Sequence, residues 1–117
     1  MELKDATLAL AALGQSTRLS VFRLLVEAGP DGRMAGDIAE ALSLPGATLS
    51  FHLKELAAVG LIQGEQRGRF ICYRADFGTM NALIGFLMHN CCGGQADACL
   101  PAPALATGAS AGKRSCP

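Results

Sequence analysis

The chain has no tryptophan, one tyrosine and five phenylalanines among its 117 residues, so its core must be built from aliphatic side chains. An excess of charge of one sign is also lacking, because ten Lys and Arg balance ten Asp and Glu. This balance argues against a highly basic, histone-like protein, although locally placed basic residues can still serve DNA binding. Charged residues make up 17% and hydrophobic residues 50% of the chain, which excludes a disordered or collagen-like protein.

Long hydrophobic runs are missing, since no apolar stretch approaches the roughly 18 residues that a membrane-spanning helix needs. The nearest candidate, residues 6–13, follows a net acidic segment and precedes no convincing small-residue cleavage site, which argues against an export signal. We interpret this stretch as a helix of the domain and expect a cytoplasmic protein. A chain of this length has room for one domain with a modest core.

Cysteines are few and unevenly placed. The chain has five, an odd number, and four of them lie in its last quarter. A secreted disulfide scaffold usually carries an even set spread through a loop-rich chain. We therefore expect reduced thiols that act as ligands or sensors near the C-terminal end. Cys72 is expected to be a small core residue of a strand, and Cys116 a free thiol of the tail.

The spacing of apolar residues, with Gly and Pro as breaks, predicts five helices and one hairpin. The first helix is expected at residues 6–13. The second begins with Ser16 as its cap and ends before Gly29. The other three are expected at about residues 36–42, 47–59 and 77–92. The strands are expected at 61–65 and 70–74, joined through residues 66–68. The predicted fold is therefore mainly α with a β-hairpin.

The last predicted helix is apolar around most of its circumference, which is typical of a helix buried on two sides. In so small a protein, a partner subunit is the simplest cover for the second side. After Gly93-Gly94 the chain becomes rich in Pro, Ala, Gly, Ser and Thr, which predicts a flexible tail. We therefore divide the chain into a domain at residues 1–92 and a cysteine-containing loop and tail at residues 93–117.

The order of helix, tight turn, helix and hairpin is that of a winged helix-turn-helix domain. On the fourth predicted helix, Leu49, Leu53 and Leu56 form one stripe at about 100° per residue, which leaves the opposite side for a DNA groove. Small and hydroxyl-bearing residues there let the backbone approach base edges, and Phe51 could touch a thymine methyl. The contacts expected from this helix are Ala47, Thr48, Ser50, Phe51, His52 and Lys54.

Residues outside this helix are expected to contact the DNA backbone. Arg67 and Arg69 lie at the predicted hairpin tip, where flexible cations can reach phosphates or the minor groove. Ser16 and Arg18, at the start of the second helix, are expected to add a backbone contact. His52 is expected to pack or to form a hydrogen bond near the DNA face rather than to bind a metal.

Several of these segments together resemble the signature of the ArsR/SmtB repressors. The segments are Ser50-Phe51-His52-Leu53-Lys54-Glu55-Leu56, Gly60-Leu61-Ile62, Arg67-Gly68-Arg69 and Tyr73-Arg74, preceded by Leu13-Gly14, Arg18-Leu19 and Ile38-Ala39. Members of this family are homodimers, built on the first and last helices, that repress transcription until a metal or metalloid binds. The resemblance covers roughly residues 5–92. It implies about five helices with a two-stranded wing, and a DNA-binding repressor that is not an enzyme.

Cys91, Cys92 and Cys99 lie where the last predicted helix ends. Adjacent helical residues point about 100° apart, so neighbouring thiols can face one ligand only if the last turn frays, which Gly93-Gly94 favours. The following loop can return Cys99, and three thiolates suit a soft trivalent ion such as As(III) or Sb(III). Residues 90–93 with a third cysteine also resemble an arsenic-sensing branch of the family. This resemblance makes the three cysteines the expected effector ligands.

Other ligands of these thiols stay open. Zn(II) prefers four ligands, usually with closely spaced cysteine pairs, and would have to recruit His89 or Cys116. The helix Asp/His pairs of zinc-sensing relatives are missing, and residues 34–37 lack the Cys-x-Cys motif of the best-known arsenic and cadmium sensors. Redox or persulfide sensing and inert surface thiols are the remaining interpretations.

Two other classes of function have less support. An enzyme would need a carboxylate pair, a phosphate-binding loop or a Cys/His dyad, and His89 and Cys91 do not face each other at i and i+2 of a helix. A thiol-rich metalloid carrier without a DNA-binding role would need neither the hairpin arginines nor an exposed face on the fourth helix.

Overall fold

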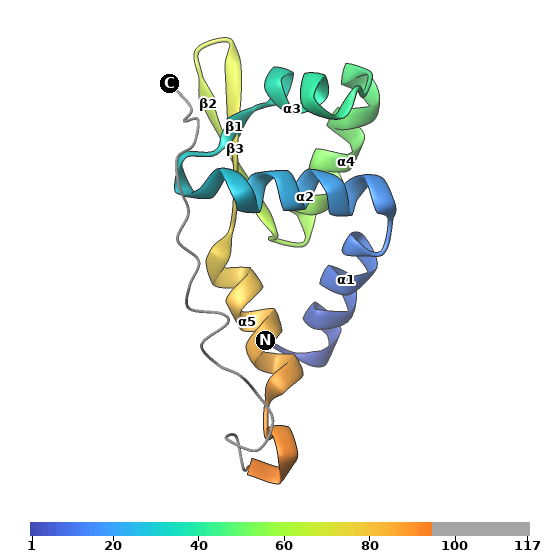
Figure 1. Ribbon diagram of the computed structural model, residues 1–117, viewed down its shortest axis with the longest axis vertical. Coiled ribbons are helices and arrows are strands. Elements are labelled where there is room, and N and C mark those ends of the chain that lie inside the picture. Colours follow the sequence, from blue (N-terminus) through green and yellow to red (C-terminus); the bar gives the residue numbers. More distant parts are fainter. Residues whose placement is uncertain (95–117) are drawn as a thin grey trace.

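The computed structural model describes residues 1–94, which form five helices and a small sheet (Figure 1). The helices are α1 (Leu3–Leu13), α2 (Ser16–Ala28), α3 (Ala35–Leu42), α4 (Gly46–Ala58) and α5 (Phe77–Met88). The strands are β1 (Arg33–Met34), β2 (Ile62–Arg67) and β3 (Phe70–Ala75), and short 3₁₀ turns cover Gly29–Asp31 and Cys91–Gly94. α2 crosses the middle of the molecule, with the hairpin and α3 toward one end and α1 and α5 toward the other. The predicted winged helix-turn-helix order is confirmed.

The sheet contains three strands rather than the two expected from the sequence. β3 lies in its centre, antiparallel to β1 on one side and to β2 on the other. In β1, Arg33 pairs with Tyr73 and Met34 pairs with Cys72. This strand was not predicted because two residues are too few to show an alternation of polar and apolar side chains. β2 and β3 turn at Gly68, whose φ of +64° is a left-handed conformation that glycine adopts readily.

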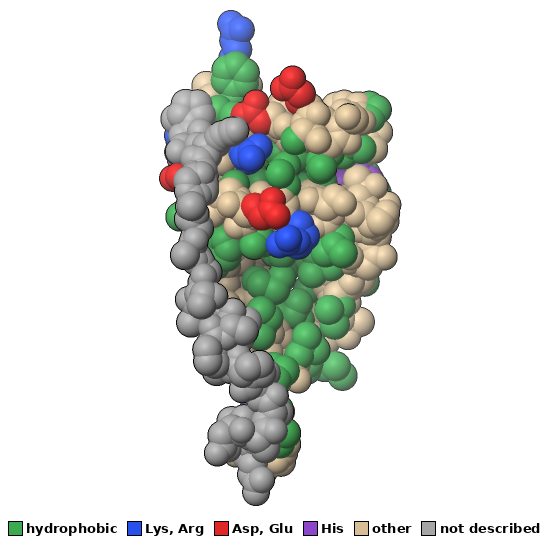
Figure 2. All heavy atoms as spheres, viewed as in Figure 1, with side chains coloured by type: hydrophobic (Ala, Val, Ile, Leu, Met, Phe, Trp, Pro, Cys, Tyr) green, Lys and Arg blue, Asp and Glu red, His purple; other side chains and the backbone are tan. Residues whose placement is uncertain are grey.

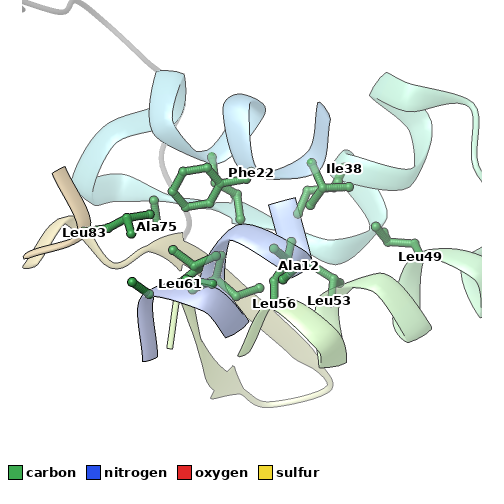
Figure 3. Close-up of a cluster of buried hydrophobic side chains, with 14 residues drawn as sticks. Ala12, Phe22, Ile38, Leu49, Leu53, Leu56, Leu61, Ala75 and Leu83 are labelled. Atoms are coloured by element: carbon green, nitrogen blue, oxygen red, sulfur yellow. The ribbon is translucent and has the colours of Figure 1, made fainter. Parts of the chain in front are cut away.

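The core between the helices and the sheet is mostly aliphatic, as the composition predicts (Figure 3). Leu25, Ile38 and Leu56 are fully buried and come from α2, α3 and α4 respectively. Leu61 and Leu83 join the cluster from the segment before β2 and from α5. The core therefore holds α4 in place from several directions at once.

α1 and α5 turn much of their apolar surface away from the core. α1 buries alanines and exposes leucines, namely Ala6, Ala9 and Ala12 against Leu3, Leu8 and Leu10. α5 buries Leu83 but exposes Ile84, Leu87 and Met88. Figure 2 shows hydrophobic side chains gathered over the lower half of the view, where α1 and α5 lie. None of the helices in the described chain is long and apolar enough to cross a membrane.

Several helix ends differ from the sequence expectation. α1 begins at Leu3 rather than at residue 6. α5 ends at Met88 instead of residue 92, because the backbone leaves the helical conformation and Asn90 takes a left-handed φ of +59°. Gln15 rather than Ser16 caps α2, since its side-chain oxygen accepts a hydrogen bond of 2.8 Å from the Arg18 backbone amide. The earlier end of α5 places the cysteine pair in a separate turn.

Candidate nucleic-acid interface and cysteine pair

α4 presents a polar face to solvent beside the hairpin. Leu49, Leu53 and Leu56 are buried against the rest of the domain, as their spacing predicts. Because successive helical residues are about 100° apart, this anchoring turns the opposite face outward. The exposed residues of that face are Ala47, Thr48, Ser50, Phe51 and Lys54. Most of these side chains are small, hydroxyl-bearing or basic, whereas Phe51 is a large apolar ring that is 55% exposed.

A tight turn sets the angle between α3 and α4. Ser43 ends α3 in a left-handed conformation with φ +54°, and the Leu44 amide donates a hydrogen bond of 2.9 Å to the Ala39 carbonyl. Pro45 then directly precedes α4. α4 thus occupies the position of the second helix of a helix-turn-helix, the one that lies in the major groove when this motif binds DNA.

His52 differs from its exposed neighbours on α4 because it is buried. It is only 8% exposed, and its Nδ1 lies 3.4 Å from Nη1 of Arg18 on α2. The Phe51 ring packs edge-on against the imidazole, with ring centroids 5.3 Å apart. These contacts agree with the expectation that His52 packs beside the exposed face. A direct contact of His52 with DNA stays a prediction.

Arg18 reaches from α2 back to the end of α1. Its Nε donates a hydrogen bond of 2.8 Å to the Ala12 carbonyl oxygen. The Arg18 side chain is half-buried and engaged within the domain, whereas Ser16 is exposed at the same end of α2. A DNA-backbone contact by Ser16 or Arg18 stays a prediction.

Glu65 holds two arginines of the sheet. Its Oε1 accepts hydrogen bonds from Arg67 Nη2 at 3.1 Å and from Arg74 Nη1 at 3.0 Å. The hydrogen bond from Arg67, followed by that from Arg74, holds the pKa of the Glu65 carboxyl below its ordinary value. Arg69, in the turn of the hairpin, belongs to none of the ion pairs formed within residues 1–94. Arg69 is therefore more available to a phosphate than Arg67.

A groove of about 450 Å³ separates α4 from the hairpin. Ser50 and Lys54 line it from α4, and Gln66 and Tyr73 line it from the sheet. The Tyr73 ring lies over Gly64, where an added Cβ would come within 2.8 Å of ring carbon Cε1, so this packing favours glycine. Hydroxyl, amide and ammonium groups together can accommodate a negatively charged strand.

Cys91 and Cys92 lie together in the turn after α5. Their Sγ atoms are 3.7 Å apart, and Cys92 adopts a left-handed conformation (φ +53°, ψ +37°) instead of continuing a helix. Cys99 and Cys116 lie outside the described residues. In residues 1–94, no group of three or more His, Cys, Asp or Glu side chains is arranged to hold a metal ion. Cys72 is buried in β3, as expected.

Sequence reasoning missed Glu65 as the partner of the wing arginines. The contact between Glu65 and Arg67 could have been predicted, because residues two positions apart on one strand share a face of the sheet. The contact with Arg74 also required the strand register, which pairs Glu65 with Cys72 and Gln63 with Arg74. If the strand ends are misplaced by one residue, the predicted register changes and such a diagonal contact between neighbouring strands cannot be predicted.

Comparison with known proteins agrees with this architecture. Residues 13–65 match a family model described as a helix-turn-helix domain. No curated protein matches the chain in sequence. The known proteins that this chain resembles are therefore found through the domain family and through solved structures.

Three solved structures are similar over most of the chain. An ArsR-like transcriptional regulator from Rhodococcus sp. RHA1 is 26% identical, with a TM-score of 0.66, over 93% of this chain and 96% of the regulator. HlyU from Vibrio cholerae N16961 is 24% identical, with a TM-score of 0.62, over 79% of this chain and 99% of HlyU. The third structure is the homodimeric winged helix-turn-helix DNA-binding domain Mb0332 (fragment 1–100) from Mycobacterium bovis, described as a possible ArsR-family regulator. It is 25% identical, with a TM-score of 0.60, over 75% of this chain and 82% of the Mb0332 chain.

These likenesses and the geometry define the class of protein. The chain contains a helix-turn-helix domain. Its architecture is the winged DNA-binding fold found in ArsR-like transcriptional regulators. α4 is the recognition helix of that fold, and the β2–β3 hairpin is its wing.

Replacing Arg67 with Gln should raise the pKa of Glu65 toward its ordinary value, because the main stabilising hydrogen bond is lost. Arg74→Gln should raise the pKa less, since its hydrogen bond contributes less. Carboxyl titrations followed by NMR in the wild type and both variants measure this order. Because the folded-state pKa is lowered, both pairings act at neutral pH and weaken as the pH falls through that pKa. Equal pKa values in all three proteins would contradict the assignment.

Proposed function

We propose that this chain is a transcriptional repressor that binds operator DNA as a homodimer and is released when As(III) or Sb(III) binds cysteine thiolates after α5. The observation that carries the DNA-binding half is the exposed polar face of α4 beside the hairpin. The likeness to an ArsR-like transcriptional regulator supports the regulatory half.

In this proposal α4 enters the major groove and the wing follows the adjacent backbone. Thr48 and Ser50 supply hydroxyl groups that can donate to or accept from base edges, and Phe51 can pack on a thymine methyl. Lys54 lies beside the groove between α4 and the wing, where a phosphate strand would pass. Arg69 supplies a cation from the hairpin tip. A neutral chain thus meets DNA through a few locally placed groups.

The homodimer forms through α1 and α5 in this proposal. Both helices expose leucines although the same helices also pack on the core. A contiguous exposed apolar surface in a small protein is typical of a protein–protein interface. The Mycobacterium bovis domain, which is described as homodimeric, supports the same arrangement. A dimer also provides two copies of α4 for the two half-sites of a palindromic operator.

The effector half of the proposal rests on the cysteine turn. In the reduced protein, Cys91 and Cys92, whose sulfur atoms lie 3.7 Å apart, would supply two thiolates to one soft ion, and Cys99 would supply a third. As(III) is satisfied by three thiolates, whereas Zn(II) prefers four ligands. A zinc-responsive repressor and a thiol-redox-responsive repressor of the same fold are the alternatives.

Release requires that the effector binds the DNA-free arrangement of the dimer more tightly than the DNA-bound one. The cysteine turn follows α5 directly, and α5 packs against α1. A change at the turn can therefore alter how two subunits meet and how far apart their α4 helices lie. A coupling of about 1–3 kcal/mol, or roughly 5- to 150-fold in DNA affinity, would be typical.

Arg69→Gln should weaken DNA binding at every sequence and reduce the slope of log affinity against log salt by about 1, because one phosphate contact is lost. Fluorescence anisotropy on DNA from upstream of the protein's own gene, measured at several salt concentrations, tests this. Arg23→Gln is the matched control, since Arg23 is an exposed arginine on α2 that pairs with Glu27. An unchanged slope in Arg69→Gln would remove Arg69 from the interface, and no binding by the wild type would refute the repressor.

Leu87→Glu should convert the dimer to a monomer, because a charge would be buried in the proposed interface at a position that is 55% exposed in the single chain. Sedimentation velocity measures the change. Leu19→Glu is the matched control, since Leu19 is an exposed leucine on α2 and its variant should remain a dimer. A monomeric wild type, or a dimeric Leu87→Glu variant, would contradict the interface.

Cys91→Ser and Cys92→Ser should each bind DNA like the wild type but no longer respond to arsenite, because an alcohol does not replace a thiolate toward a soft ion. Anisotropy of the reduced proteins on DNA, titrated with arsenite and separately with zinc, measures release. Cys99→Ser in the same assay tests the third ligand. Release by zinc or by an oxidant, with no effect of arsenite, would favour an alternative, and an arsenite response in the Ser variants would place the site elsewhere.

A further inference from the structure

Asp76 is the single residue between the wing and the helix that follows it. β3 ends at Ala75 and α5 begins at Phe77, and Figure 1 shows α5 continuing from the end of β3 away from the hairpin. Asp76 itself has an extended backbone (φ −91°, ψ +95°). A residue has only two soft backbone dihedral angles, so the angle between the hairpin and α5 depends on these two and on any contacts that hold them.

The Asp76 side chain forms hydrogen bonds with both of the elements that its backbone joins. On the α5 side, Oδ1 accepts a hydrogen bond of 3.0 Å from the Thr79 backbone amide and so caps the helix. On the wing side, Oδ2 accepts a hydrogen bond of 2.7 Å from Nε2 of Gln63 on β2. One carboxylate therefore holds the wing and the start of α5 together.

The direction of both hydrogen bonds is defined by their chemistry. The bond from Thr79, followed by that from Gln63, holds the pKa of the Asp76 carboxyl below its ordinary value, so this group is ionised at neutral pH. An ionised carboxylate only accepts hydrogen bonds, and in Gln63 only the NH2 group can donate one. The Gln63 amide is therefore held in a single orientation.

The end of α4 belongs to the same junction. The Leu61 amide donates a hydrogen bond of 3.1 Å to the Leu56 carbonyl of α4, and the Leu61 carbonyl accepts one of 2.8 Å from the Asp76 amide. A Cβ added at Gly60 would lie 3.7 Å from Oγ1 of Thr79, so the chain that leaves α4 passes close to the first turn of α5. The recognition helix, the wing and α5 therefore meet around Asp76.

Farther along, α5 is held in its own subunit by apolar contacts. Leu83 is buried, and Met80 and Phe86 are partly buried against the core. Apolar residues on the other side of the helix, such as Leu87, are exposed. Apolar contacts are not directional, so they define the angle between α5 and the hairpin less sharply than the two hydrogen bonds of Asp76 do.

We propose that Asp76 is a positioning residue that fixes the angle between the wing and α5, and thereby the spacing at which a dimer presents its two DNA-binding surfaces. The proposal rests on the DNA-binding role and the α1–α5 dimer proposed above. Because α5 would form the contact between subunits, a change of angle at Asp76 moves the wing and α4 of each subunit relative to those of its partner. The dimer geometry in turn sets the spacing of the half-sites. Asp76 and Gln63 act within the protein and do not contact DNA.

Gln63→Ala removes the hydrogen bond to the wing without changing the charge or the cap of α5. Fluorescence anisotropy compares DNA from upstream of the protein's own gene with the same duplex carrying one inserted base pair between the half-sites. The wild type should prefer the uninterrupted duplex. Gln63→Ala should reduce this preference by roughly three- to tenfold, the scale of one hydrogen bond, because a looser junction adapts to the wrong spacing. Its salt slope should equal that of the wild type, since no phosphate contact is lost.

Substitutions of Asp76 separate the bond to the wing from the helix cap. Serine caps helices well but is too short to reach Gln63, so Asp76→Ser should reduce the preference as Gln63→Ala does. Asparagine also caps, and its NH2 group can donate to Gln63 Oε1 once the Gln63 amide turns over. Asp76→Asn should therefore keep the wild-type preference. It is the matched control, because it removes the same negative charge as Asp76→Ser.

The double variant with Asp76→Ser and Gln63→Ala should resemble either single variant, because both substitutions remove the same bond. A wild-type preference in Gln63→Ala and Asp76→Ser would overturn the proposal. So would an equal fall in affinity for both duplexes, since a general loss of structure does not depend on half-site spacing. An equal effect of Asp76→Asn and Asp76→Ser would assign the change to charge and contradict the role of the bond.

NMR of the DNA-free protein tests the junction independently of the proposed function. Residual dipolar couplings of amides in β2, β3 and α5 should fit one common alignment in the wild type and in Asp76→Asn. In Gln63→Ala the couplings of the hairpin should shrink relative to those of α5, because the angle between them is no longer fixed. One common alignment in Gln63→Ala would overturn the proposal. Failure of every folded protein to bind DNA would refute the repressor and leave this measurement to decide the junction.

Discussion

The burial of three leucines on α4 is the constraint on which the rest of the structure depends. Leu49, Leu53 and Leu56 hold the helix against α1, α2 and β2, and this fixes which side of α4 faces solvent. Rotating the helix by one residue, about 100°, would bring a leucine to the surface and a polar side chain into an aliphatic core. The same packing places α4 beside the hairpin and creates the groove between them. The candidate DNA surface is therefore a consequence of core packing.

Much of the fold could be predicted from the sequence, since the leucine spacing and the Gly and Pro breaks are local signals. The element ends were less accessible, because they depend on single backbone conformations such as the left-handed Asn90 after α5. β1 escaped prediction because two residues carry no pattern. The exposed face of α4 was predictable from its own periodicity. The contacts of Arg18 and of Glu65 were not, because they join residues 34 and 9 positions apart through tertiary packing and strand register.

The arginines of the wing differ in whether they form ion pairs within the domain. Arg67 and Arg69 are two positions apart, yet only Arg67 pairs with Glu65, whereas Arg69 belongs to none of the ion pairs in the described part of the chain. An exposed ion pair contributes little to stability. It does reduce the positive potential of the hairpin, and it orders Arg67 and Arg74 along the sheet. The hairpin thus presents one cation at its turn, which suits a single backbone contact better than a broad basic patch.

In the proposed repressor, a signal from the cysteine turn would reach DNA through a short series of contacts. The turn follows α5, α5 packs on α1, and the end of α1 is joined to α4 through Arg18. The inner side of α1 consists of alanines, so its backbone lies close to its neighbours and a small displacement is not absorbed by flexible side chains. An effector that shifts α5 in the dimer would move α1, and Arg18 would carry that movement to the recognition helix.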